Sequence, residues 1–329
     1  MARVLSGIKP SGDLTLGNYI GALQYFVADQ EVHDSFFCVV DLHAITVPQD
    51  PDELRRRSLD IAALYLAVGL DPHKATLFLQ SHVPEHAELG WVLGCYATVG
   101  ELRRMTQFKD KAGKKEGSVS LGLFAYPALM AADILIYQAD RVPVGDDQRQ
   151  HLELTRDIAE RFNARYGATF VVPEAAIPEQ GARIMDLQNP DNKMSKSEES
   201  PQGTLNLLDP PEAVRKKIRS AVTDSGREIV AHEDKPAITN LLTIFAEVTG
   251  RSVPDLQREY DGKGYGDFKS VLADALVAFL EPIQKRYGDI IADEAELKRT
   301  LSAGADKARA VASSTVATAF ERIGFVPRG

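Results

Sequence analysis

The stretch that decides the fold is Arg3-Val-Leu-Ser-Gly-Ile-Lys-Pro-Ser-Gly-Asp-Leu-Thr-Leu-Gly-Asn18, which joins a short strand to a helix through a glycine-rich turn. Its first four residues have strand character, and Gly17 to Gln30 carries apolar side chains at helical spacing. Glycines at positions 7, 12 and 17 let a ligand approach the backbone closely, and the free N–H groups of a helix N-terminus bind phosphate. The stretch predicts a nucleotide-binding turn at the edge of a parallel sheet. A surface turn followed by a capped helix is the alternative.

Strand and helix patterns alternate along the N-terminal half. Phe36 to Val40 and Ala75 to Leu79 are apolar runs of strand length, and Val142 to Val144 is a shorter one. Helical patterns cover 51–69, 87–105 and 126–137, and another follows residue 147, whereas the Lys- and Arg-rich segment 103–115 predicts a loop. This alternation predicts an α/β fold with a Rossmann-like parallel sheet. From about Pro210 onward the patterns indicate a smaller region of helices alone, with apolar stripes along 268–283 and 308–323.

The composition is that of an ordinary globular protein. The 329 residues are 44% hydrophobic and 26% charged, which suits one large domain and a second, smaller one. There is no secretory signal and no apolar run near the roughly 20 residues that span a bilayer. With only two cysteines, both in apolar surroundings, a cytoplasmic location is expected. The net charge of −9 argues against a protein that coats nucleic acid through bulk positive charge, although a local basic stripe can still bind RNA.

The histidines show no metal-ligand spacing. All seven are scattered, and the closest pair, His82 and His86, flanks Pro84, which breaks a shared helical face. Both are predicted to be surface or capping residues. No protein-bound metal site is therefore expected.

A second motif, Lys193-Met-Ser-Lys-Ser197, lies in a stretch dominated by Pro, Asn, Asp, Lys and Ser. Two lysines three residues apart, with hydroxyl groups beside them, can surround a phosphate on a flexible arm, because lysine is a mobile point charge. A solvated lysine run is the ordinary alternative. The surrounding segment, 187–204, also predicts a domain boundary.

Together the two motifs resemble the signatures of the class I aminoacyl-tRNA synthetases. Lys193 to Ser197 matches their KMSKS signature, and Thr15-Leu-Gly-Asn18 resembles their HIGH signature, with Thr15 and Asn18 in place of the two histidines. This variant is typical of the bacterial tryptophanyl-tRNA synthetases. The resemblance continues through 41–46, 100–109, 126–133, 142–163 and 181–185, and it is densest over 6–200.

The resemblance implies an enzyme that activates tryptophan with ATP and transfers it to the 3′ end of its tRNA. The substrate carboxylate attacks the α-phosphorus and pyrophosphate leaves, so groups that stabilise the phosphoryl oxygens contribute most, with Mg²⁺ bridging the phosphates. The implied catalytic residues are Thr15, Asn18, Lys111, Lys193 and Lys196. The implied ATP contacts are Lys9, Pro10, Ser11, Gly17, Asn18, Gly145, Asp146, Asp147, Ile184, Lys193, Met194, Ser195, Lys196 and Ser197.

Asp133 is the most informative residue for the choice of amino acid. A carboxylate within Leu129-Met-Ala-Ala-Asp-Ile-Leu135 is expected to be buried, and a buried charge requires partners. Indole has one N–H donor and no acceptor, which suits a carboxylate, but the phenol of tyrosine also donates. A structural anchor in the core is the alternative role for Asp133. The implied tryptophan-binding residues are Gly7, His43, Tyr126, Met130, Asp133, Val142, Val144 and Gln148, and Leu5 stands where many relatives have phenylalanine.

The resemblance also implies how the protein is organised. A catalytic domain is expected over 1–196, a helical anticodon-binding domain over 197–303, and a final helix, about 304–329, that packs back on the catalytic domain. A homodimer that binds tryptophan tRNA across both subunits is implied, and the apolar segment Gly90 to Tyr96 is either its interface or ordinary core. The alternatives are a tyrosyl-tRNA synthetase, a non-catalytic synthetase-like RNA-binding protein and a generic nucleotidyltransferase.

Overall fold

The structure, a computed structural model, describes residues 1–112, 119–143, 145, 148–176, 183–194 and 201–327, with the side chains of 110–112 excepted. The strands are β1 (Arg3–Ile8), β2 (Asp34–Val39), β3 (Thr76–Leu79), β4 (Arg141–Pro143) and β5 (Glu174–Ala176). The helices before residue 200 are α1 (Leu16–Asn18), the π-helical η1 (Tyr19–Leu23), α2 (Gln24–Asp29), α3 (Asp41–Ala44), α4 (Pro51–Ala67), the 3-10 turn η2 (Gln80–His82), α5 (Glu85–Gly94), α6 (Val99–Arg104), α7 (Thr106–Ala112), α8 (Leu121–Leu135) and α9 (Arg149–Tyr166). The later helices are α10 (Pro211–Ser220), α11 (Pro236–Thr249), α12 (Val253–Glu259), α13 (Tyr265–Ala292) and α14 (Glu294–Ile323).

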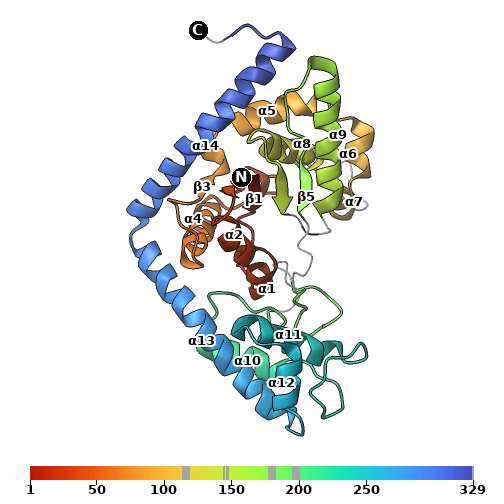
Figure 1. The fold of residues 1–329 in the computed structure, drawn as a ribbon, viewed down its shortest axis with the longest axis vertical. Coiled ribbons are helices and arrows are strands. Elements are labelled where there is room, and N and C mark those ends of the chain that lie inside the picture. Colours follow the sequence, from red (N-terminus) through yellow and green to blue (C-terminus); the bar gives the residue numbers. More distant parts are fainter. Residues whose placement is uncertain (113–118, 144, 146–147, 177–182, 195–200, 328–329) are drawn as a thin grey trace.

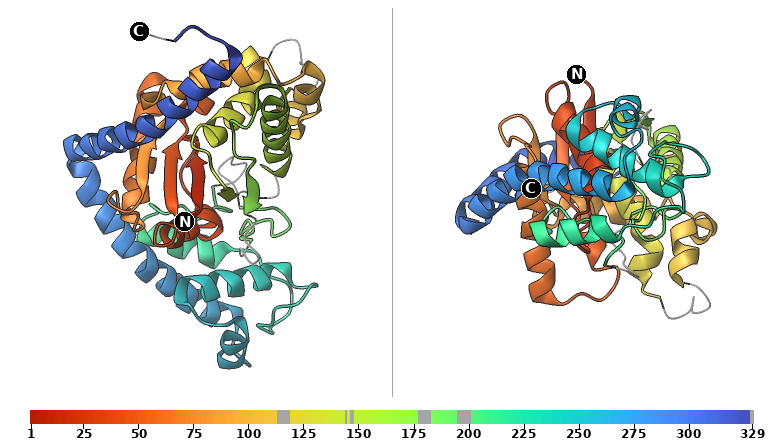
Figure 2. Two further views of the ribbon diagram at one scale, coloured as in Figure 1. Left: turned by 45° about the horizontal axis from the view of Figure 1, so that its top comes forward. Right: turned by 90° about the horizontal axis from the view of Figure 1, so that it is seen from below.

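The described strands form one parallel sheet in the order β3-β2-β1-β4-β5 (Figure 2). β1 lies at its centre, where Leu5 is opposite Phe36 of β2 and Val4 is opposite Arg141 of β4. The predicted Rossmann-like sheet is therefore confirmed. The short edge strand β5 was not predicted, because three residues are too few to show an alternation of apolar and polar side chains.

Alternate residues of each strand enter different cores, as strand geometry requires. Phe37 and Val39 of β2 pack with α2 and α4 in a core that continues into the later helices, whereas Phe36 and Cys38 face the core shared with α5, α8 and α9. Both faces of the sheet are covered, which is the usual condition of a parallel sheet. Its carboxyl-terminal edge is left for a ligand.

Two sequence predictions between residues 87 and 115 are wrong. The single helix expected over 87–105 is two helices, because the Thr98 side chain accepts the backbone N–H of Glu101 and caps a new helix, α6. The segment expected to be a loop forms α7, because Phe108 is only 4% exposed and its ring packs edge-on against Phe124, with ring centroids 5.1 Å apart. Tertiary packing thus overrides the density of positive charge in that segment.

α10, α11 and α12 lie below the sheet in Figure 1, and α13 and α14 run back along one side of the molecule. The Tyr287 hydroxyl of α13 donates to Asp60 of α4 at 2.7 Å. α14 crosses β3 so closely that a Cβ on Gly304 would lie 1.8 Å from the Leu77 carbonyl oxygen, which makes glycine necessary there. The domain limits at residues 196 and 303 stay predictions. No helix in the described part of the chain is long and apolar enough to cross a membrane.

Candidate functional site

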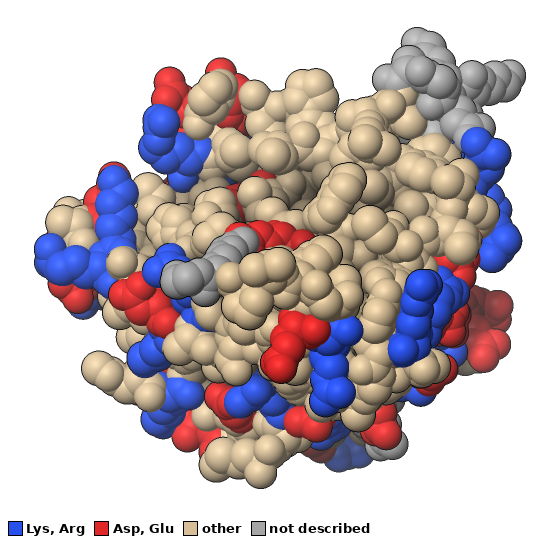
Figure 3. Space-filling view, turned by 90° about the horizontal axis from the view of Figure 1, so that it is seen from above, with Lys and Arg blue, Asp and Glu red and all other residues tan. Residues whose placement is uncertain are grey.

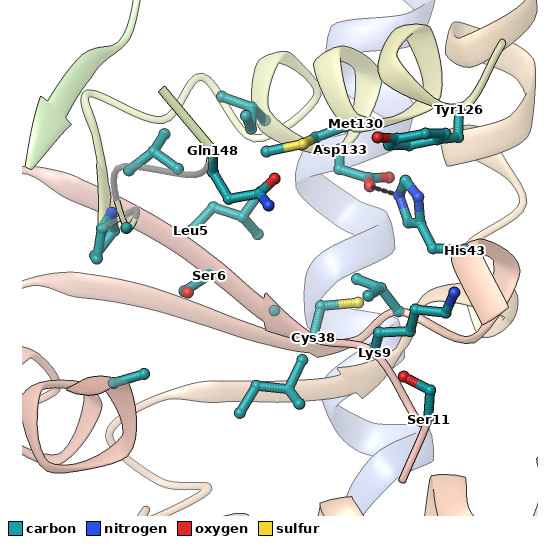
Figure 4. Close-up of a pocket in the computed structure, with 18 of the residues that line it drawn as sticks. Leu5, Ser6, Lys9, Ser11, Cys38, His43, Tyr126, Met130, Asp133 and Gln148 are labelled. Carbon is teal, nitrogen blue, oxygen red and sulfur yellow. Dashed lines mark hydrogen bonds and ion pairs between the residues drawn. The ribbon is translucent and has the colours of Figure 1, made fainter. Parts of the chain in front are cut away.

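A cavity of about 490 Å³ lies at the carboxyl-terminal edge of the sheet, between β1 and α8 (Figure 4). In Figure 4 the side chains of Tyr126, Met130 and Asp133 project from α8 toward β1, and Lys9 and Ser11 lie below them. The lining residues that the sequence predicts for amino-acid binding are Gly7, His43, Tyr126, Met130, Asp133, Val142 and Gln148. Those that it predicts for ATP binding are Lys9, Ser11, Asn18 and Gly145.

Gly7 forms the floor of this cavity at the end of β1. A Cβ at this position would lie 2.8 Å from Cγ1 of Val40 and 3.0 Å from the Cys38 carbonyl oxygen. Both distances are tighter than ordinary contact, so any larger side chain would push against Val40 and the backbone of β2. Glycine therefore suits the close approach of β1 and β2 at this end of the cavity.

Asp133 is the centre of a buried hydrogen-bond network. Its Oδ1 accepts from Nε2 of Gln80 and pairs with Nδ1 of His86, and its Oδ2 pairs with Nε2 of His43, all at 2.7 Å. Nε2 of His86 lies 2.7 Å from the Tyr137 hydroxyl. The expectation that a buried Asp133 has several partners is confirmed, and the same carboxylate lines the cavity.

The ionisation of Asp133 follows from this network. Burial alone would raise the pKa of its carboxyl group, but His43 and His86 outweigh burial and lower the pKa to about 2. The side chain is therefore an anion at neutral pH. An ionised carboxylate only accepts hydrogen bonds, so it presents an acceptor to the cavity.

Tyr126 closes the cavity from the first half of α8. Its hydroxyl lies 2.7 Å from Nε2 of His151 and 3.0 Å from Oε1 of Gln107, and its ring packs edge-on against the ring of His43. Burial raises the pKa of the Tyr126 hydroxyl, which therefore stays protonated. It is a neutral polar group on the cavity wall.

The Thr15–Asn18 motif is a helix cap. The Thr15 side chain accepts the Asn18 backbone N–H at 3.1 Å, and the Asn18 side-chain oxygen accepts the Thr15 backbone N–H at 3.0 Å. Thr15 is fully buried and does not line the cavity, whereas Asn18 does. The motif therefore fixes the turn that holds Lys9 and Ser11.

The segment that carries Lys193 is tied to the helical region. Met185 forms a β-bridge with Lys193, and the Asn240 side chain of α11 bonds the backbone N–H and the carbonyl oxygen of Met185, each at 2.9 Å. The Met194 N–H donates to the Ile184 carbonyl oxygen at 3.0 Å. Lys193 itself is exposed, and Ile184 and Met194 are buried.

The fold brings the two motifs together. Thr15 pairs with Asn206 in a β-bridge, the Leu16 N–H donates to the Leu205 carbonyl oxygen at 2.7 Å, and a Cβ on Gly17 would lie 3.6 Å from Cβ of Met194. Pro10, Gly17, Ile184, Lys193 and Met194 are near this junction but do not line the cavity. Val144, Asp146, Asp147, Ser195, Lys196 and Ser197, and the side chain of Lys111, lie outside the described residues.

Sequence reasoning missed Gln80, His86 and Tyr137. The prediction that His86 is a surface or capping residue is wrong, because its side chain is fully buried between Asp133 and Tyr137. Gln80 and His86 follow the carboxyl end of β3, where open α/β sheets bind ligands. Their position after a predicted strand was the signal that could have identified them as site residues.

The comparisons with known proteins agree with this geometry. A family model of tRNA synthetases class I (W and Y) matches residues 1–281. The chain belongs to the class I tRNA synthetases. This synthetase is 55% identical over 329 residues to the tryptophan–tRNA ligase of Caldanaerobacter subterraneus subsp. tengcongensis, and the match covers 100% of each chain.

Two solved structures resemble this synthetase over almost their whole length. The tryptophanyl-tRNA synthetase of Mycoplasma pneumoniae has a TM-score of 0.89 at 41% identity, covering 99% of this chain and 98% of the other. That of Campylobacter jejuni, complexed with ADP and tryptophan, has a TM-score of 0.84 at 37% identity, covering 98% of this chain and 100% of the other. The predicted family and fold class are both confirmed.

Proposed function

We propose that this synthetase is a tryptophan–tRNA ligase. It activates L-tryptophan with ATP, releases pyrophosphate, and transfers the tryptophanyl group from the adenylate to the 3′ end of its tRNA. The observation that carries this proposal is the buried Asp133, held by Gln80, His86 and His43, which lines the same cavity as Lys9 and Ser11 of the turn after β1. The full-length similarity to tryptophan–tRNA ligases supports the same activity.

The amino-acid half of the cavity suits tryptophan. The indole N–H would donate to Asp133, while Met130, Val142 and Gly7 supply apolar walls. Leu5 also lines the cavity, in the place of an aromatic ring. The hydroxyl of Tyr126 and the amide of Gln148 would accept from the substrate ammonium, with His43 nearby. Val144 is assigned to the same wall by resemblance alone.

The ATP half of the site is proposed around the first turn. Lys9, Ser11, Asn18 and Gly145 line the cavity and would contact the nucleotide. Lys193 and Lys196, with Lys111, would neutralise the triphosphate as pyrophosphate leaves, because charge builds on the phosphoryl oxygens in the transition state. This reaction needs positioning and electrostatic stabilisation rather than a nucleophilic side chain.

Mg²⁺ would be held mainly by the phosphates of ATP. The described residues contain no group of three or more His, Cys, Asp or Glu side chains that could bind a metal ion. Mg²⁺ takes oxygen ligands and keeps several waters, so phosphate oxygens suit it. The bound ion would neutralise charge on the departing pyrophosphate.

A homodimer in the cytoplasm is the proposed working form. The large apolar side chains of Trp91 on α5, Val99 on α6 and Leu121 on α8 are 78%, 61% and 78% exposed, and burial of such groups against a partner is favourable. Seen from above, the upper middle of the surface is largely uncharged, and Lys, Arg, Asp and Glu are more frequent at the sides and over the lower half of the view (Figure 3). Such a surface suits contact with a second copy. The tryptophan tRNA would bind across both subunits.

Charging of tRNA tests the proposal. The protein is incubated with ATP, Mg²⁺, bacterial tRNA and labelled tryptophan, and the acid-precipitable label is counted; labelled tyrosine is the matched control. Tryptophan should be attached and tyrosine should not. Attachment of tyrosine instead would favour the tyrosyl enzyme, and attachment of neither would favour a non-catalytic RNA-binding protein.

A further inference from the structure

The two oxygens of Asp133 have unequal surroundings. Oδ1 has two partners, Gln80 and His86, each at 2.7 Å, and both side chains are fully buried. A carboxylate oxygen has two lone pairs, so Oδ1 has no capacity left for a ligand. Oδ2 has one partner among the described residues, His43, which itself lines the cavity. A donor that enters the cavity therefore finds its acceptor at Oδ2.

The hydrogen bond between His86 and Oδ1 of Asp133 has a fixed donor. An ionised carboxylate cannot donate, so Nδ1 of His86 must carry the hydrogen that it shares with Asp133. On the other side of the ring, Nε2 lies 2.7 Å from the Tyr137 hydroxyl. Burial raises the pKa of Tyr137, so this hydroxyl keeps its proton and stays uncharged beside the ring. His86 thus donates to Asp133 through Nδ1 and is held through Nε2 by Tyr137.

Aromatic side chains of the sheet hold Tyr137 and His86 in place. The Tyr137 ring stacks on Phe36 of β2 with ring centroids 4.7 Å apart, and it packs edge-on against Phe78 of β3 at 5.7 Å. The rings of Phe78 and His86 are also neighbours, with their centroids 6.0 Å apart. β2 and the edge strand β3 therefore set the position of Tyr137 and His86, and these residues set the plane of the carboxylate.

We propose that His86 and Tyr137 are positioning residues for amino-acid recognition. They occupy Oδ1 and orient the carboxylate so that Oδ2 accepts the side-chain N–H of the substrate. This inference rests on the proposed function and extends it, because it assigns selection of an N–H donor to residues that act through Asp133. A group supported in this way loses less freedom when the ligand binds.

A cycle that varies both the protein and the substrate tests this assignment. The substrates are tryptophan and its benzothiophene analogue, in which sulfur replaces the indole N–H. The measured quantity is kcat/KM in ATP–pyrophosphate exchange. If the analogue is not turned over, its inhibition constant is measured instead. His86→Leu removes the donor to Asp133. His86→Asn is the matched variant, because its amide N–H can occupy the place of Nδ1. Tyr137→Phe removes only the hydroxyl.

His86→Leu should lower kcat/KM for tryptophan by about 10- to 100-fold, as loss of a hydrogen bond to a charged group would, and should affect the analogue less than about threefold. His86→Asn should recover most of the loss, and Tyr137→Phe should lower kcat/KM for tryptophan by about three- to tenfold. The KM for ATP should stay within about twofold of wild type in every variant.

Equal losses for tryptophan and the analogue would overturn the assignment and leave His86 and Tyr137 as core residues only. Unchanged tryptophan kinetics in all three variants would overturn it as well. If His86→Leu does not fold, the smaller change in Tyr137→Phe decides the question by the same comparison. Absence of tryptophan-dependent exchange in the wild-type protein would instead refute the proposed function, so the two failures are distinguishable.

Discussion

Gly17 and Met194, which belong to the two motifs that the sequence places far apart, are neighbours in the fold. A Cβ built on Gly17 would lie 3.6 Å from both the Cβ and the carbonyl oxygen of Met194, and 3.4 Å from Oγ1 of Thr15. The first turn and the segment that carries Lys193 therefore form one continuous surface. Any ATP-binding role of the lysine segment depends on this contact.

Substitution of Gly17 tests the contact between the motifs. Gly17→Ala should be tolerated, since its methyl group would meet its neighbours at ordinary contact distance. Gly17→Val should push Met194 away and raise the KM for ATP about fivefold or more, in line with the usual cost of overpacking. Gly21→Val is the matched control, because a Cβ there has nothing within 4 Å. An unchanged KM for ATP in Gly17→Val would show that the lysine segment does not depend on this contact.

Asn240 is predicted to hold the same segment from the helical side. Asn240→Ala removes two hydrogen bonds to the backbone of the partly buried Met185 and leaves its N–H and carbonyl oxygen without these partners, so the free energy of unfolding should fall by about 1–3 kcal/mol. The KM for ATP should also rise, whereas Thr243→Ala, on the same helix, should leave it unchanged. Chemical denaturation and exchange kinetics measure the two effects. A loss of stability with normal ATP kinetics would limit Asn240 to folding.

Lys196 is predicted to act mainly in the transition state. Lys196→Ala should lower the single-turnover rate of adenylate formation by about tenfold to a thousandfold, the usual range for a preorganised charge. The affinity for ATP should change much less, because the charge matters most as pyrophosphate leaves. Lys216→Ala, an exposed lysine of α10, serves as the control. A mutant rate equal to wild type would make Lys196 a solvated surface lysine.

The pKa of Asp133 predicts a pH-dependent contribution to stability. Burial raises this pKa, but His43 and His86 lower it from the ordinary 3.8 to about 2. A folded-state pKa below the unfolded one stabilises the protein fully above pH ~4, and the gain is lost as the pH falls through about 2. Asp133→Asn should therefore be less stable than wild type by roughly 2–5 kcal/mol at pH 7. Denaturation at a series of pH values checks this, and a difference that does not shrink below pH 4 would contradict it.

The parallel sheet could be predicted from the sequence because it depends on local patterns, whereas the predicted residues that line the cavity follow from the family resemblance. Apolar runs predict the strand that precedes Gly7 and the helix that carries Asp133. The glycines of the first motif and the lysines of the second indicate phosphate binding. The mistakes have a common physical cause. His86 follows a proline among polar residues, so its local sequence suggests a surface position, yet its burial depends on Tyr137 and Asp133, which lie far along the chain.

The helix α7 escaped prediction for a similar reason. Its charges suggest a loop, whereas tertiary contacts such as the packing of Phe108 against Phe124 and the hydrogen bond from Thr106 to Gln150 stabilise it. The contact of Gly17 with Met194 is another long-range relationship that no window of sequence contains. Sequence patterns therefore name candidate groups for the reaction, and tertiary contacts decide how the described ones are supported.

Amino-acid-dependent ATP–pyrophosphate exchange is the most direct test of the proposed function. The purified protein is incubated with ATP, Mg²⁺ and labelled pyrophosphate, with each of the twenty amino acids in turn, and label in ATP is measured. Because exchange reports adenylate formation alone, the result does not depend on the tRNA supplied. We predict that tryptophan supports exchange far above every other amino acid. Exchange that is absent, or strongest with tyrosine, would contradict the account.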